Sequence, residues 1–198
     1  AFVNITKLSC WGGEITNLDL SNNPLLETIE LVDNQISMIN LSQNTEVTLL
    51  WLEKNALTNV DISANTKLEN IAVGYNQLTT LDVSTNAELW AITAEENQLT
   101  TIDVSNNKKL TNLWVFNNPN FNKVDVSKNT LLSRIGIWGT SIEILDLSNN
   151  PITGLWAANN LQLKHLDVRN GNNLNISTFN ISNTPILTCV NVDDETAD

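Results

Sequence analysis

The amino-acid sequence predicts a β-solenoid, in which short coils of chain stack along one axis and each coil packs its apolar edge against its neighbours. The first observation is a 21-residue repeat: NQLTTLDVSTN begins at Asn76 and NQLTTIDVSNN begins at Asn97. The second is that each repeat carries two short segments in which apolar and polar residues alternate, which is typical of strands. The third is length, because 21 residues holding two strands and two turns leave no room for a helix of ordinary length.

One of the two segments reads LDLS or a close variant, and its leading apolar residue recurs as an anchor. Eight anchors are spaced by 21 residues, apart from one spacing of 22: Leu18, Ile39, Val60, Leu81, Ile102, Val124, Leu145 and Leu166. A degenerate ninth anchor is assigned to Phe179, only 13 residues after Leu166. We therefore predict a single domain over residues 1–198, with about eight coils over 5–169 and a compressed closing cap over 170–194.

The other segment reads LxLxxNxL, as in IELVDNQI from Ile29, LWLEKNAL from Leu50 and IAVGYNQL from Ile71. Strands one coil apart lie side by side, so their side chains should stack in register. We expect these strands to form a parallel sheet on the concave face. On the convex face we expect short strands or turns instead of helices.

The whole repeat, LxxLxLxxNxLxxLDLxxN, resembles the leucine-rich repeat family, and specifically the short 21-residue bacterial subclass of internalin-type and Bacteroidetes surface proteins. This resemblance covers roughly residues 5–194. It implies a right-handed superhelix and a role in adhesion or contact outside a bacterial cell. The ending TPILTCVNVDD resembles a closing segment in which the chain continues to another cysteine, which implies a missing partner for Cys189; a free thiol is the alternative.

Three polar columns repeat with the coils. Buried asparagine amides can satisfy backbone groups of adjacent turns, so we predict structural roles for two columns, Asn34, Asn55, Asn76, Asn97, Asn118 and Asn160, and Asn23, Asn44, Asn65, Asn86, Asn107, Asn129 and Asn150. The third is the aspartate column of the LDLS segments: Asp19, Asp61, Asp82, Asp103, Asp125, Asp146 and Asp167. We expect these carboxylates to accept hydrogen bonds from nearby Ser and Thr on the convex face. A calcium row is the alternative, although no calcium-loop spacing is present.

Composition narrows the range of partners. The net charge of −12 and the isoelectric point near 4.3 argue against binding nucleic acid or an anionic membrane surface. No apolar run approaches membrane-spanning length. The chain begins at Ala1 without a signal peptide, so we expect a mature or excised fragment of a secreted or cell-surface protein. Cys10 and Cys189 belong to the first and last coils, roughly 40 Å apart, and cannot pair with each other.

Patterns typical of enzymes and of metal or cofactor sites are missing. The single histidine, His165, lies beside an anchor leucine without a nearby nucleophile, and there is no glycine-rich phosphate loop or CxxC pair. A glycosidase-like pair of carboxylates is the remaining enzymatic alternative. We predict a protein that is not an enzyme and needs no cofactor or metal.

The candidate binding site lies on the concave face, where the residue between the two leucines of each LxL strand points outward, as does the residue after the second leucine. One outward row is predicted to end at Asn191 and the other at Asp193. The residues predicted to bind a ligand are Glu30, Trp51, Glu53 and Glu95 in earlier coils and Trp114, Phe116, Gly136, Trp138 and Trp156 in later ones. Exposed aromatic residues usually mark an interaction site.

Within this face, Trp114 and Trp156 flank Gly136. Two strand steps separate the indoles by ~9.5 Å, which leaves room for one flat ring or sugar between them. We therefore hypothesise a slot; the alternative is that the tryptophans pack on each other. The predicted function is protein recognition or adhesion through the concave face. Polysaccharide binding through the tryptophan-rich half is the alternative, and the ligand itself is not identified.

Overall fold

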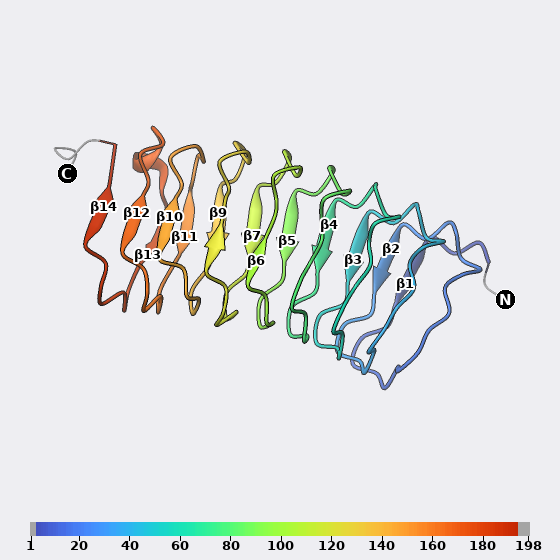
Figure 1. Ribbon diagram of the computed structural model, residues 1–198. Coiled ribbons are helices and arrows are strands. Elements are labelled where there is room, and N and C mark those ends of the chain that lie inside the picture. The colour runs from blue at the N-terminus through green and yellow to red at the C-terminus, as the bar shows by residue number, and fades with distance from the viewer. Residues whose placement is uncertain (1–2, 194–198) are drawn as a thin grey trace.

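The computed structural model describes residues 3–193 as an elongated stack of coils, with the first and last coils at opposite ends (Figure 1). The outer limits of the predicted domain, residues 1–2 and 194–198, lie outside the described residues. One nine-stranded parallel sheet runs through the stack in the order β1-β2-β3-β4-β5-β7-β9-β11-β13. Its strands are β1 (Lys7–Ser9), β2 (Thr28–Glu30), β3 (Leu49–Trp51), β4 (Asn70–Ala72), β5 (Ala91–Thr93), β7 (Asn112–Trp114), β9 (Arg134–Gly136), β11 (Gly154–Trp156) and β13 (Thr178–Asn180).

The opposite, convex side carries shorter and less continuous pairing. β6 (Thr101–Ile102) pairs with β8 (Lys123–Val124), and β10 (Ile144–Asp146) pairs with β12 (His165–Asp167), which pairs with β14 (Cys189–Asn191). Within residues 3–193 the one helical element is a single 3-10 turn, η1 (Asn173–Asn175). The predicted leucine-rich repeat solenoid, with its sheet on the concave face and strands or turns on the convex face, is confirmed.

Each coil contributes a set of inward side chains to one continuous core. In the fourth coil these are Leu68, Ile71, Val73, Leu78, Leu81 and Val83, all nearly inaccessible to water. Fully burying such a side chain contributes about 1.5–3 kcal/mol. The stack is therefore stabilised coil by coil, and its rigid sheet fixes where the outward side chains point.

The first asparagine column joins each coil to the one before it. Asn97 shows the pattern: its Nδ2 donates to the carbonyl oxygens of Val73 at 3.0 Å and Glu95 at 3.0 Å, and its Oδ1 accepts from the Leu78 N–H at 2.9 Å. In the second column, five members (Asn44, Asn65, Asn107, Asn129 and Asn150) use only the donor side of the amide among the described residues. Asn107 Nδ2 donates to Val83 and Asn86 carbonyls, while its Oδ1 is buried without a partner among the described residues. Both columns are structural, as predicted.

The turn that follows each concave strand needs a left-handed backbone. The residue just before the first asparagine column has φ between 51° and 59° in six coils: Asp33, Lys54, Tyr75, Glu96, Asn117 and Asn159. Gly12 and Gly139 take the same place, at φ 66°, in two coils that lack this asparagine, and Asn183 takes it, at φ 55°, in the last coil. Glycine and asparagine adopt this conformation at little cost, whereas a residue such as Tyr75 adopts it with strain.

The last coil differs from the prediction. Phe179 is not a convex anchor: it belongs to β13 and lies opposite Leu155 in the concave sheet, while Val190 lies opposite Leu166 on the convex side. Groups of this coil therefore bond to groups 24 residues earlier, as Asn183 does to Asn159. The predicted compression into 13 residues is wrong, since the coil is longer than the others. The central outward row consequently ends at Asn180 opposite Trp156, and Asn191 lies in the convex sheet.

Candidate functional site

The concave sheet presents two outward rows of side chains. The central row is the last residue of each strand, with Glu30 opposite Trp51, Trp114 opposite Gly136, and Gly136 opposite Trp156. The flanking row lies two residues further along each coil and contains Glu53, Gly74, Glu95, Phe116, Trp138 and Ala158, linked by backbone hydrogen bonds from coil to coil. All nine residues predicted to bind a ligand lie in these rows, so the structure brings them onto one face.

Four aromatic side chains, Trp114, Phe116, Trp138 and Trp156, form what we call the aromatic cluster. The Trp114 and Trp156 ring centroids are 4.9 Å apart with planes inclined by 52°, and Phe116 stacks on Trp138 with centroids 3.5 Å apart and planes inclined by 11°. Each of the four is only partly exposed. They come from coils β7, β9 and β11, which are successive in the sheet.

The slot predicted between Trp114 and Trp156 is closed. Trp114 leans over Gly136, where an added Cβ would overlap the Trp114 ring and lie 3.1 Å from Cζ3 of Trp138. Two indoles that would otherwise face water gain more by packing on each other across the glycine. The hypothesis of a slot is therefore wrong, and the alternative of mutual packing describes this part of the face.

A hollow does open beside Trp156. It has a volume of about 320 Å³ and is lined by Trp138, Trp156, Ala158, Asn159 and Asn180. It exists because the flanking row changes from an indole at Trp138 to a methyl group at Ala158. The sequence prediction missed Ala158, Asn159 and Asn180: the drop in size at Ala158 was visible, but Asn180 could be assigned to this face only with the true length of the last coil.

A second aromatic pair lies at the N-terminal end of the face. Trp11 contacts Trp51 edge to face, with centroids 6.0 Å apart, and Trp51 Nε1 donates to Asn70 Oδ1 at 3.2 Å. Trp11 is 57 % exposed and was not among the predicted ligand-binding residues. The concave face is therefore aromatic at both ends, not only in its later coils.

The glutamates of the concave face differ in what surrounds them. Glu30 is buried and already engaged: Lys7 Nζ lies 2.8 Å from Oε1, and Ser9 Oγ donates to Oε2 at 2.8 Å. The nearby ammonium of Lys7 holds the pKa of Glu30 below its usual range. The Glu30 carboxylate therefore links the first two coils and has less capacity left to bind an external ligand.

Glu95 is the unusual group of the face. Its carboxylate lies over Gly74, where an added Cβ would come within 2.6 Å of it, and the side chain is only 6 % exposed. Its Oε2 has no hydrogen-bond partner among the described residues. Burial, with the charges of Glu53 and Glu96, raises the pKa of Glu95 to about 7, although its own backbone N–H opposes the shift. Burial also raises the pKa of Glu53, opposed by Lys54.

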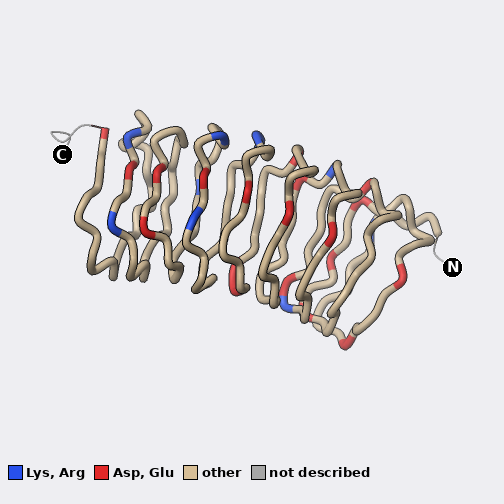
Figure 2. Tube along the Cα trace, in the orientation of Figure 1, with Lys and Arg blue, Asp and Glu red and all other residues tan. Residues whose placement is uncertain are grey.

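Acidic residues recur from coil to coil along the molecule, and basic ones are fewer (Figure 2). In the aspartate column, the carboxylate accepts the backbone N–H two residues later, as Asp125 does from Ser127 at 3.0 Å. The side-chain hydroxyl and the backbone N–H of Ser127 lower the pKa of Asp125, in agreement with the predicted structural role. Within residues 3–193, no three His, Cys, Asp or Glu side chains gather where they could hold a metal ion.

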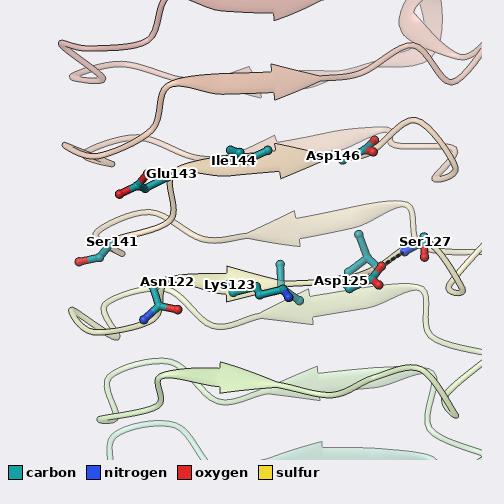
Figure 3. A pocket seen from close by; sticks show the side chains of 10 residues that line it. Asn122, Lys123, Asp125, Ser127, Ser141, Glu143, Ile144 and Asp146 are labelled. Atoms are coloured by element: carbon teal, nitrogen blue, oxygen red, sulfur yellow. Dashed lines mark hydrogen bonds between the residues drawn. The ribbon is translucent and has the colours of Figure 1, made fainter.

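A larger hollow lies on the convex side, between β8 and β10 (Figure 3). It is an open depression of about 850 Å³ whose rim carries Lys123, Asp125, Glu143 and Asp146, with Ile144 62 % exposed. Its aspartates cap turns as their equivalents do in other coils. Because its polar groups repeat throughout the solenoid, nothing distinguishes this depression as a recognition site, and we place the candidate site on the concave face.

The remaining chemically reactive side chains do not form a site. Cys10 packs against the core of the first coil and Cys189 belongs to β14 in the last coil; both are free thiols. His165 is exposed on β12. The helical turn in residues 3–193 is far too short to cross a membrane.

Comparison with known proteins agrees with this architecture. Residues 141–159 match the family model described as Leucine Rich Repeat. Among solved structures, the functional domain of InlJ from Listeria monocytogenes, which includes a cysteine ladder, is 32 % identical over 82 % of this chain, with a TM-score of 0.77. No curated protein matches the sequence.

Two further structures share the fold at lower identity. The LRR protein LIC12759 from Leptospira interrogans is 16 % identical over 96 % of this chain with a TM-score of 0.74, and internalin C2 from Listeria monocytogenes is 21 % identical over 95 % with a TM-score of 0.65. This chain spans 39 % of the InlJ structure, 61 % of the Leptospira structure and 80 % of internalin C2.

Proposed function

Because the chain belongs to the bacterial leucine-rich repeat proteins of internalin type, we propose that it is a non-enzymatic, extracellular module that binds a protein partner through its concave face. The observation that carries the proposal is the aromatic cluster. Four large rings lie side by side on a rigid sheet and remain partly exposed. Aromatic side chains held in place before binding supply much of the energy at protein interfaces, since little conformational entropy is lost when they are covered.

Charge supports a basic partner. The chain carries a net charge of −12; on the concave face, Glu53 lies in the coil of Trp51 and Glu95 lies between the two aromatic ends. Negative potential over the sheet would steer a positively charged surface into contact and disfavour an acidic one. The likeness to internalin-type proteins supports adhesion at a bacterial cell surface as the setting. Polysaccharide binding through the slot is not proposed further, because Trp114 occupies that space.

The test uses an array of purified extracellular proteins that includes basic and acidic members. The native chain, the double variant Trp114→Ala and Trp138→Ala, and the control Trp90→Ala are applied at equal concentration. Trp90 is 41 % exposed but precedes its strand, outside both outward rows, so it matches the loss of an indole without touching the cluster. Thermal unfolding of each variant establishes that the fold is retained.

We expect the native chain to bind a subset of basic proteins, the control to bind the same subset, and the double variant to lose at least about tenfold in affinity, as expected when anchor side chains are removed. Binding that survives the double substitution contradicts the proposal. So does an array on which the native chain binds no protein.

A further inference from the structure

The hollow beside Trp156 has the features of a small binding site of its own. It is lined by two indoles, Trp138 and Trp156, by the methyl group of Ala158, and by the amide side chains of Asn159 and Asn180. None of the five described residues that line it carries a charge. Its volume of about 320 Å³ falls at the lower end of the range of pockets that hold small ligands.

Each of the two asparagines that line the hollow uses its amide oxygen within the protein. Asn180 Oδ1 is occupied, since it accepts from the Ser182 N–H at 3.1 Å and from Ser182 Oγ at 2.8 Å. Asn159 Oδ1 accepts from Asn183 Nδ2 at 2.8 Å. Among the described residues neither Asn159 Nδ2 nor Asn180 Nδ2 has an acceptor, and both side chains are exposed. The hollow is therefore lined by two indoles and by two asparagines whose amide N–H groups have no acceptor among the described residues.

We infer that this hollow binds a single pyranose ring. The apolar C–H face of a sugar packs on an indole, and its ring substituents carry several oxygens that accept hydrogen bonds from the amides. A partner's aromatic or aliphatic side chain would fill the same space but would leave both amide donors covered and unpaired, which is costly. An anionic ligand is disfavoured because no cation lines the hollow and the chain is strongly acidic.

This sugar site goes beyond the proposed protein recognition and does not depend on it. It lies at the C-terminal end of the concave face, is lined by Trp138 and Trp156 of the aromatic cluster, and has room for about one ring. The ring can come from a free polysaccharide or from a glycan carried by a glycoprotein. Both sources present the same chemistry to the hollow.

The site is tested with N-acetylglucosamine, methyl α-glucopyranoside and methyl α-mannopyranoside, followed by saturation-transfer NMR and tryptophan fluorescence. Two variants alter the hollow in different ways. Ala158→Leu fills it, and Asn180→Asp keeps the acceptor used by Ser182 while replacing the free donor. Ala87→Leu and Asn149→Asp make the same exchanges at exposed positions elsewhere. Thermal unfolding checks that all four variants fold.

We expect roughly millimolar binding of at least one sugar, as befits so few atoms, with a loss of at least about tenfold in Ala158→Leu and in Asn180→Asp and none in the controls. Native protein that binds no sugar overturns the inference, as does binding that persists in both hollow variants. Binding of N-acetyltryptophanamide in the hollow without any sugar binding also overturns it, in favour of a partner side chain.

The same variants separate the two sources of the ring. A soluble polysaccharide tests the free source, and a glycoprotein measured before and after enzymatic removal of its glycans tests the attached one. Loss of glycoprotein binding on glycan removal and in Asn180→Asp places the sugar of the glycoprotein in the hollow. Failure of the protein array, by contrast, has no bearing on this site.

Discussion

The buried carboxylate of Glu95 should make the stability of the solenoid depend on pH in a way that one substitution removes. Glu95 titrates at about 7 in the folded chain against an ordinary value of 4.5. Between these values the unfolded chain has released the proton and the folded chain still holds it, so the unfolded state binds fewer protons. Stability must therefore fall as pH rises through this window.

The size of the effect follows from the shift. One pKa unit corresponds to about 1.4 kcal/mol, so a shift of about 2.5 units costs roughly 3 kcal/mol once pH is above 7. Glu95→Gln keeps the shape and does not titrate. The free energy of unfolding of the native chain, relative to this variant, should therefore fall by about 2–3 kcal/mol between pH 5 and pH 8.5.

The assay is urea denaturation of both proteins across this range, followed by circular dichroism. Taking the difference between the two proteins cancels the pH dependence of all other groups. Glu69→Gln, which removes an exposed carboxylate, controls for the loss of one charge. Parallel stability profiles for the native chain and Glu95→Gln would refute the account of an uncompensated carboxylate over Gly74.

Four further substitutions test the packing. Asn97→Ala should lower the free energy of unfolding by about 2–4 kcal/mol, because it leaves buried carbonyls and an N–H unpaired. Asn107→Ala should lower it by less, because the Asn107 amide uses only its donor. Equal losses of stability in urea denaturation would contradict this difference. Gly136→Val should displace the Trp114 ring, change the near-ultraviolet circular dichroism and cost about 1–3 kcal/mol; an unchanged spectrum would argue against the contact. Tyr75→Asn should raise stability by about 1 kcal/mol, because asparagine tolerates φ 55° better; a lower melting temperature would count against backbone strain there.

The regular coils could be predicted almost completely because a fixed period leaves few ways to arrange the chain. Once Asn76 and Asn97 are seen to begin nearly identical segments, register follows for every neighbouring coil. The alternation of inward leucines with outward residues then places all predicted ligand-binding residues on one face. This much depends only on backbone geometry, which the repeat determines.

The last coil could not be predicted for a physical reason. Concave and convex segments both alternate apolar and polar residues, so a short segment such as the one around Phe179 fits either layer when the asparagine and glycine landmarks are lost. Strand pairing with the preceding coil determines which layer the segment joins, and it places Phe179 opposite Leu155 in the concave sheet. The wrong assignment of Phe179 also affected the predicted binding face, because the central row ends at Asn180 and not at Asn191.

The side-chain arrangement was predictable only in part, because coil spacing does not determine side-chain torsions. The missing side chain of Gly136 was interpreted as an open gap, whereas in the structure the Trp114 ring packs into that space. Gly74 plays the same part for the carboxylate of Glu95, and both glycines lie one coil away from the group they accommodate. A glycine beside a large residue in the same outward row is therefore a better sign of close packing than of a vacant slot.

The most direct test of recognition through the concave face is oxidative footprinting of the six tryptophans, with and without a basic protein bound by the native chain on the array. We predict that oxidation of Trp114, Trp138 and Trp156 slows on binding, while oxidation of Trp90 is unchanged. Slower oxidation of Trp90 with unchanged oxidation of the three cluster indoles would place the partner elsewhere and contradict the account.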